Sequence, residues 1–148
     1  MVERFELFTV LIANLARNIR RIKTEEMARW DLKSNHVSCI YYLYQKKSLT
    51  AKELCDICDE DKANVSRSIE YLEDAGFVIC ESNIHKRYRS HFKLTEKGKE
   101  VGLGICSRIK SILSKAGEGL TEEHRQIMYE SLKCINDNLE NIESEYSK

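Results

Sequence analysis

Apolar residues recur every three or four positions from about residue 3 to residue 30. This spacing places them along one side of an α-helix, so we predict a long amphipathic helix at the start of the chain. Three arginines, Arg17, Arg20 and Arg21, lie beside its apolar stripe. A second helix is predicted to follow Ser34, a residue type that favours the N-cap position.

The stretch from Leu49 to Val78, LTAKELCDICDEDKANVSRSIEYLEDAGFV, carries the signals of two short helices. Thr50 and Glu53 have the spacing of a capping box, which marks a helix start. The polar run that follows ends this helix, and Asp61 is placed to cap the next one. Gly76 stands where a glycine ends a helix. Two short helices joined by a tight polar turn form a helix-turn-helix.

After Gly76 the apolar period changes from that of a helix to that of a strand. Residues 77–80 are predicted to form a strand, and residues 89–94 a return strand with Ser90, Phe92 and Leu94 on one side. The sequence HKRYR, residues 85–89, then lies at the tip of a β-hairpin. Taken alone, this cationic tip fits a solvated turn as well as a nucleic-acid contact.

Two further helices are predicted, one capped by Thr95 and one beginning near Thr121. The apolar positions of the last helix repeat as a heptad seam: Met128, Leu132, Ile135, Leu139, Ile142 and Tyr146. This spacing fits packing against a second copy of the chain and equally fits cover of its own core. The predicted fold is mainly α with a small β-hairpin, in a single domain over residues 1–148. A lobe of about residues 34–98 is flanked by long helices at about 3–30 and 99–146.

The distribution of charged residues along the chain says more about function than the net charge does. The 24 Lys and Arg residues balance the 24 Asp and Glu residues, so an indiscriminate polyanion binder is disfavoured. However, residues 84–99 are basic and residues 118–148 are acidic. No apolar run is long enough to span a bilayer, and residues 1–10 lack a secretion pattern. We therefore expect a cytoplasmic protein without a membrane partner.

The chain shows no signature of an enzyme or a metal site. It lacks the nucleophile-elbow, phosphate-loop, zinc-protease and dinucleotide-binding motifs, so we expect no catalytic residues and no cofactor. Its six cysteines are scattered through apolar segments, and we predict reduced, buried thiols. Cys55 and Cys58 have CxxC spacing, but the second ligand pair of a zinc site is absent, so a core role is favoured and no metal is expected.

The candidate chemistry lies on the second helix of the helix-turn-helix. Lys62, Asn64, Ser66 and Arg67 fall on the face opposite its apolar residues. Arg pairs with both acceptors of a guanine edge, Asn pairs with adenine, and Ser and Lys contact bases or phosphates. The alternative is an ordinary polar helix face. The position between a capped short helix and a basic hairpin favours contact with double-stranded DNA.

Together, the stretch from Leu49 to Val78 and the later LTEKG motif resemble the MarR (multiple antibiotic resistance regulator) family of winged-helix transcriptional regulators. This resemblance implies a homodimeric regulator, most often a repressor, on a roughly palindromic operator. The recognition helices would enter major grooves about one helical turn apart, and the hairpin would be the wing. It also implies dimerisation by the terminal helices, which carry Phe8, Leu11, Leu15, Leu132, Ile135, Leu139 and Ile142.

Within this resemblance the wing departs from the family pattern. Relatives usually have Asp-x-Arg there, whereas Lys86 and Tyr88 occupy those positions in this chain. Lys86, Arg87 and Arg89 keep the wing cationic, and we expect Arg87 and Arg89 to be the contacting pair. Many relatives release DNA when a small-molecule effector binds, often an anionic aromatic, and Arg17, Arg20 and Arg21 are candidates to hold such an anion. An exposed helix face is the alternative for these arginines.

Two other functions are compatible with the sequence. The neutral net charge and the altered wing fit a winged-helix protein-interaction module that has lost DNA binding. The cysteines leave open a redox-sensing or metal-sensing regulator of the same fold, although no cysteine lies near the start of the first helix, where oxidant sensors of the family carry theirs.

Overall fold

The computed structural model describes residues 2–81 and 89–146. In these residues the chain forms six helices and one three-stranded antiparallel sheet, as the predicted fold class requires. The elements are α1 (Val2–Ala28), α2 (Ser34–Lys46), β1 (Leu49–Thr50), α3 (Ala51–Cys58), α4 (Lys62–Asp74), β2 (Val78–Cys80), β3 (His91–Leu94), α5 (Glu96–Ala116) and α6 (Glu122–Tyr146). The chain divides into two compact units, Met1–Arg108 and Ile109–Lys148, which are described separately below.

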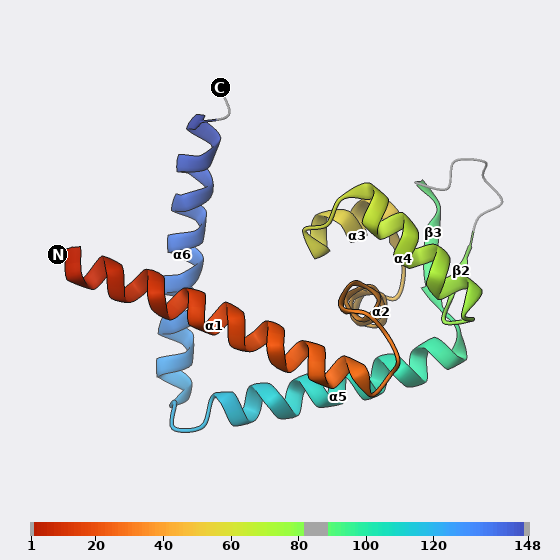
Figure 1. Ribbon diagram of the computed structural model, residues 1–148, viewed down its shortest axis with the longest axis horizontal. Helices are drawn as coiled ribbons and strands as arrows, with labels where there is room; N and C mark the ends of the chain where they lie inside the picture. The colour runs from red at the N-terminus through yellow and green to blue at the C-terminus, as the bar shows by residue number, and fades with distance from the viewer. Residues whose placement is uncertain (1, 82–88, 147–148) are drawn as a thin grey trace. The chain divides into compact units, whose positions relative to one another are not determined.

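Helix α2 lies at the centre of the first unit, where it contacts α1, α3, α4 and β3 (Figure 1). The residues that meet around it are apolar and almost fully buried. Ile40 of α2, Leu54 of α3, Leu72 of α4 and Phe92 of β3 each have 0% of their surface exposed. Burial of such side chains is the main stabilising contribution to a domain of this size. The helix-turn-helix is therefore built directly on α2.

The sheet has the strand order β1-β3-β2, with Leu49 opposite Phe92 and Val78 opposite Leu94. The hairpin of β2 and β3 was predicted, and Ser90, Phe92 and Leu94 are all buried as expected. Strand β1 was not predicted. It has two residues, and so short a strand gives no alternating pattern in the sequence.

Helix starts follow the predicted caps, with one exception. Thr50 Oγ1 accepts a hydrogen bond from the Glu53 amide at 3.2 Å, and Glu53 Oε2 accepts one from the Thr50 amide at 2.7 Å. Asp61 Oδ1 caps α4 through the Asn64 amide at 2.8 Å. The predicted cap at Ser34 is wrong: the N-cap is Lys33, whose amide donates to Nδ1 of His36 at 3.2 Å. The imidazole ring therefore accepts the hydrogen bond that a Glu side chain accepts in a capping box.

Two glycines are required by the backbone where the lobe meets α5. Gly76 has a φ of 79°, in the left-handed region that glycine tolerates best. At Gly98 an added Cβ would lie 2.1 Å from the carbonyl oxygen of Phe77. Thr95 joins the same place, since its hydroxyl donates to the Gly76 carbonyl at 2.6 Å and accepts from the Gly98 amide at 3.0 Å. The threonine and glycine of LTEKG therefore fix the start of α5 against the end of α4.

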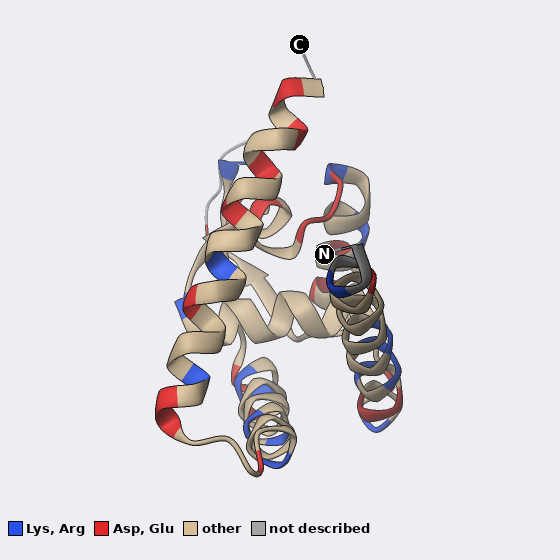
Figure 2. Ribbon diagram, turned by 90° about the vertical axis from the view of Figure 1, so that its left-hand side faces the viewer, with Lys and Arg blue, Asp and Glu red and all other residues tan. Residues whose placement is uncertain are grey.

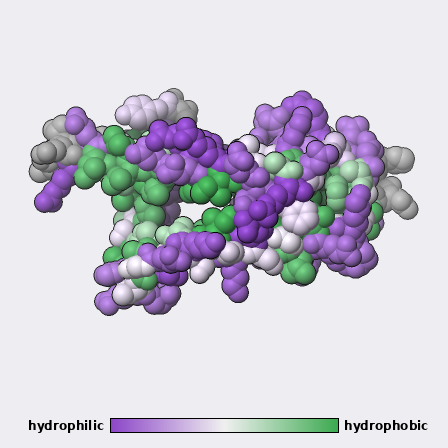
Figure 3. All heavy atoms as spheres, turned by 60° about the horizontal axis from the view of Figure 1, so that its bottom comes forward, coloured by the Kyte–Doolittle hydropathy of each residue, from purple (hydrophilic) through white to green (hydrophobic). Residues whose placement is uncertain are grey.

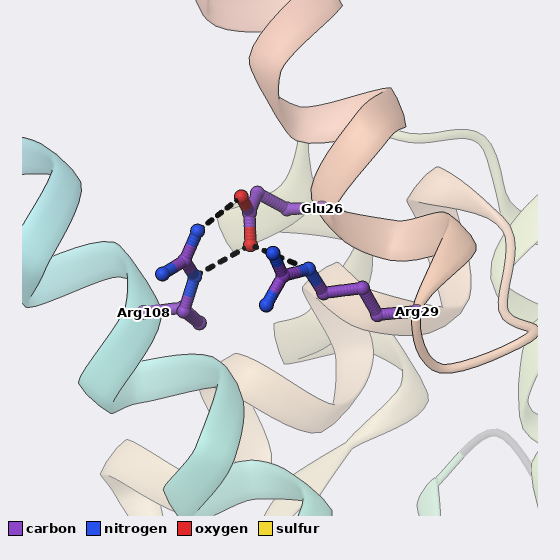
Figure 4. A network of polar contacts seen from close by, with 3 residues as sticks. All are labelled: Glu26, Arg29 and Arg108. Atoms are coloured by element: carbon purple, nitrogen blue, oxygen red, sulfur yellow. Dashed lines mark hydrogen bonds and ion pairs between the residues drawn. The ribbon is translucent and has the colours of Figure 1, made fainter.

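A charged contact fastens the end of α1 to α5 (Figure 4). Arg108 Nε and Nη2 donate to the two carboxylate oxygens of Glu26 at 2.7 and 2.6 Å, and Arg29 Nε lies 3.7 Å from the same carboxylate. The hydrogen bonds from Arg108 hold the pKa of Glu26 below its ordinary value. A bidentate pair of this kind fixes orientation as well as distance.

The second unit contains the end of α5, a turn and α6. The turn closes through Arg125 Nη2, which donates to the Gly117 carbonyl at 3.0 Å, and through Thr121, whose hydroxyl accepts from the His124 amide at 3.2 Å. No residue of α6 is buried. Acidic residues are spaced along this helix (Figure 2), in agreement with the acidic end seen in the sequence.

The cysteines only partly match the prediction of buried thiols. All six are free, as predicted, and Cys39 is 2% exposed. Cys55, Cys58 and Cys106 are half-buried, but Cys80 and Cys134 are exposed, so for these two the prediction of burial is wrong. Cys80 is the last residue of the short strand β2, and α6 buries none of its residues.

None of the helices in the described segments has both the length and the hydropathy needed to cross a membrane.

Candidate DNA-binding surface

Helix α4 separates its apolar and polar residues onto opposite faces. Val65, Ile69 and Leu72 are at most 2% exposed and pack into the lobe. Lys62, Ser66 and Arg67 are exposed, whereas Asn64 is half-buried. The structure thus brings all four candidate residues together on the first two turns of α4. A helix start also presents unpaired amides and the positive end of the helix dipole, both of which attract phosphate.

Asn64 is held by its neighbours in a way that the sequence did not indicate. Its Nδ2 donates to Asp61 Oδ2 at 3.0 Å and to Glu60 Oε2 at 3.2 Å, and its Oδ1 accepts a hydrogen bond from Arg67. The side-chain amide is therefore occupied on both ends. In this arrangement Asn64 positions the Arg67 guanidinium, which retains further N–H donors for a guanine edge.

The turn before α4 is acidic. Asp59, Glu60 and Asp61 follow one another, and Asp59 adopts the left-handed conformation with a φ of 51°. Carboxylates at a helix start oppose the non-specific attraction of an anion such as DNA. They also fix the helix start and, through Asn64, the arginine. The acidic turn therefore weakens general attraction of anions to this surface while it holds the Arg67 side chain in place.

A group of polar side chains connects the two strands at the base of the wing. Glu81, just after β2, forms an ion pair with Lys93 of β3, and its amide donates to the His91 carbonyl at 2.8 Å. Ser48 Oγ donates to Glu81 Oε2 at 3.3 Å and lies 3.1 Å from Nδ1 of His91. The hydrogen bond from Lys93 lowers the pKa of Glu81. This group was not predicted from the sequence, although Glu81 stands at the edge of the basic segment.

The predicted wing contacts are only partly covered by the described residues. Arg89 is exposed and directly precedes β3. Lys86, Arg87 and Tyr88 lie outside the described residues. The structure therefore places one of the two expected arginines beside the anchored base of the hairpin.

The candidate effector and metal residues show less organisation. Arg17, Arg20 and Arg21 are exposed on α1, and Arg17 Nη2 donates to Asn14 of the same helix at 2.6 Å. This arrangement is that of an ordinary polar helix face. In the described part of the chain, no cluster of three or more His, Cys, Asp and Glu side chains has a geometry suited to a metal ion.

The sequence matches one family model and is similar to known transcriptional regulators. Residues 36–113 match the family model for a winged helix DNA-binding domain. The HTH-type transcriptional regulator BilQ of Clostridioides difficile is 24% identical over 129 residues, which cover 87% of this chain and 84% of BilQ.

Solved structures of MarR family proteins share the fold. A Listeria monocytogenes MarR family regulator in complex with 26mer DNA has a TM-score of 0.77 and 23% identity, covering 86% of this chain and 85% of that one. Staphylococcus aureus MarR in complex with salicylate and kanamycin has a TM-score of 0.82 and 13% identity, covering 95% of each chain.

Proposed function

We propose that this chain, which belongs to the family of winged-helix DNA-binding domains and has the fold of the MarR regulators, is a homodimeric transcriptional repressor of the cytoplasm that binds an inverted-repeat operator and catalyses no reaction. The observation that carries the proposal is the first two turns of α4, where Lys62, Ser66 and Arg67 are exposed above a fully buried apolar face. A recognition helix needs an apolar face that is packed into its domain and an exposed polar face that can contact DNA.

The wing is the second support. Arg89 is exposed beside β3, and Glu81 and Lys93 tie the two strands together at the base. A cationic wing contacts phosphates or a minor groove, so its contribution to affinity depends on salt more than on base sequence. Arg67 is assigned to base recognition and Arg89 to this less specific contact; Lys86 and Arg87 join Arg89 in the proposal on sequence grounds alone.

Dimer formation is supported by apolar residues that the single chain leaves exposed. On α1 these include Leu11 at 50% and Leu15 at 55%, and on α6 they include Leu139 at 55% and Ile142 at 48% exposed. Apolar areas reach the surface on the face drawn in Figure 3. Patches of this kind mark protein interfaces, and we assign them, with the half-buried Phe8 and the seam residues Leu132 and Ile135, to contact with a second copy.

The DNA proposal is tested by selecting a binding site from random double-stranded DNA with the full chain and then titrating variants on it. Arg67→Ala should cost about 1–3 kcal/mol on the selected site and little on random DNA. Arg89→Ala should weaken binding to both DNAs similarly and reduce the salt slope by about one. Arg17→Ala, an exposed arginine of α1, serves as the matched control and should change neither. Failure to select any site, with a protein partner recovered instead, would favour an interaction module.

We also propose that a small-molecule effector releases the DNA. It is supported by the Staphylococcus aureus relative that was solved with salicylate and kanamycin. Salicylate added to the complex with selected DNA should lower the bound fraction, and this release should diminish in the Arg20→Ala, Arg21→Ala double variant. Release that is identical in the double variant would remove these arginines from the proposal.

A further inference from the structure

The side-chain amide of Asn64 connects groups of opposite charge at the start of α4. Its Nδ2 donates to Asp61 Oδ2 at 3.0 Å and to Glu60 Oε2 at 3.2 Å, and its Oδ1 accepts from Nη2 of Arg67. These charges fix the orientation of the amide, because the opposite orientation would place its oxygen against two carboxylates and its NH2 group against a guanidinium. We call these four residues the Asn64 relay.

The Asn64 relay restricts a long and otherwise flexible side chain. Arg67 is exposed on α4, where an arginine has many conformations to choose from. The two carboxylates polarise the Asn64 amide, which strengthens the hydrogen bond that its oxygen accepts from Arg67. This bond uses one of the five N–H donors of the guanidinium, so enough donors are left to pair with two acceptors at once.

We infer that Asn64 is a positioning residue that makes the chain require a guanine at one base pair in each half of its operator. This inference rests on the proposed DNA-binding function and names the base that is read. The major-groove edge of guanine presents two acceptors, to which an arginine can donate together. Because the Asn64 relay holds the Arg67 guanidinium before DNA binds, less side-chain freedom is lost on binding. Asn64 thus acts on DNA through Arg67, and its own amide pairs with no base.

The sequence alone suggested another role for Asn64, that of pairing with an adenine. Such a pair needs both the NH2 group and the oxygen of the amide. In the structure both are engaged, and turning them to a base would take a donor away from the carboxylates of Glu60 and Asp61. The two roles differ measurably. A positioning residue affects the base pair that Arg67 reads, whereas a reading residue affects a base pair of its own.

Asn64→Ala removes the relay and leaves the start of α4 in place. In the parent chain the backbone amide of Asn64 donates to Asp61 Oδ1 at 2.8 Å, and its carbonyl accepts from Ser68 Oγ at 2.9 Å. Neither bond uses the Asn64 side chain, so α4 should stay capped in the variant. The variant therefore reports on the Arg67 side chain and not on the presence of the helix.

The specificity is tested on the DNA site selected by the full chain, with each base pair replaced in turn by the other three. The parent chain should prefer guanine at one position in each half by about tenfold or more, and Arg67→Ala should abolish this preference. Asn64→Ala should reduce it at the same position by about threefold to tenfold, with little change on random DNA. Added to Arg67→Ala, it should change the preference no further. Glu70→Ala, at an exposed position of the same helix, is the matched control and should keep the full preference.

A measurement without DNA tests the relay separately. Nitrogen NMR relaxation of the Arg67 Nε–H group should show an ordered side chain in the parent chain and a mobile one in Asn64→Ala. Equal mobility in the two proteins overturns the relay.

The outcomes on DNA separate this inference from the proposed function. If Arg67→Ala loses the guanine preference and Asn64→Ala keeps it in full, the inference is wrong and the proposed function stands. If Asn64→Ala relaxes a different base pair, or if the effects of the two variants add, Asn64 reads a base directly and the inference is again wrong. If the parent chain selects no site, the proposed function and the guanine requirement fail together, while the NMR comparison still decides whether Asn64 holds Arg67.

Discussion

The lobe around α2 and the helix α6 use similar apolar residues in opposite ways. In the lobe, Leu54, Leu72 and Phe92 are completely buried within the chain. In α6, Leu139 and Ile142 have the regular spacing of a buried seam but remain about half exposed. A periodic apolar stripe therefore indicates that a helix has a partner without indicating whether that partner belongs to the same chain.

The difference follows from what surrounds each element. Helix α2 is contacted by α1, α3, α4 and β3, so Leu54 and Leu72 of the helix-turn-helix are covered within the chain. In the second unit, the turn between α5 and α6 is fixed by Arg125 and Thr121, while α6 itself buries no residue. The lobe should accordingly fold by its own packing, whereas α6 should depend on association.

The largest expected effect comes from opening the core of the lobe. Phe92→Ala removes a side chain with 0% exposure and should lower the free energy of unfolding by about 3–5 kcal/mol. Urea unfolding of the full chain measures this effect. Ile79→Ala is the control on the neighbouring strand; Ile79 is 51% exposed, and its loss should cost about 0.5 kcal/mol or less. Equal losses in the two variants would contradict the assignment of the core.

A smaller but more specific effect is expected from the seam of α6. Ile135→Asp combined with Leu139→Asp should weaken the dimer by about thirtyfold or more, because the two residues together are expected to contribute about 2 kcal/mol or more to association. Sedimentation equilibrium measures the dissociation constant. Lys133→Gln, on another face of α6 and paired with Asp137, is the control and should leave it unchanged. If the double variant sediments like the parent chain, α6 is not the interface.

The sequence predicted the helix-turn-helix well because its signals are local. Thr50, Glu53 and Asp61 bond to residues three positions away, and Gly76 needs only its own backbone conformation. Such signals are complete within a few residues of sequence. The N-cap of α2 was predicted at Ser34, one residue too late. Nδ1 of His36 accepts the hydrogen bond from the Lys33 amide, and nothing in the sequence marks a histidine for this role.

Asp61 allows the local part of the comparison to be tested. Asp61→Ala removes the cap of α4 and should lower the free energy of unfolding by about 1 kcal/mol. Asp61→Asn retains the capping oxygen but loses the second oxygen, which accepts from Asn64 Nδ2, so its loss of stability should be smaller than that of the alanine variant. Urea unfolding distinguishes the two. Because Asn also removes a negative charge at the start of α4, the proposed DNA-binding function implies that the same variant should bind random DNA more tightly, which a binding titration at low salt checks.

Contacts between segments that are far apart along the chain could not be predicted from the sequence. Ser48, Glu81 and Lys93 come together only once β2 and β3 have paired. The DNA-contacting roles of Lys62, Asn64 and Ser66 stay predictions, and the role of Arg67 is a prediction that the Arg67→Ala variant tests.

The smallest expected effect concerns the wing base, where the charges are exposed and screened. The pKa of Glu81 is lowered by its hydrogen bond with Lys93, so this pair stabilises the fold above the unfolded-state pKa of about 4.3. The contribution is lost as the pH falls through the lowered folded-state pKa. Glu81→Gln should therefore be slightly less stable than the parent chain near neutral pH and indistinguishable from it in acid.

A double-mutant cycle separates this pair from general charge effects. Lys93→Met should produce the same small loss near neutral pH, and adding Glu81→Gln to it should produce little more, because the contact is already gone. Both losses should shrink as salt is added. If the two single losses simply add, the ion pair does not couple the strands. The anchoring of the wing would then rest on the backbone bond from the Glu81 amide to the His91 carbonyl, which neither substitution removes.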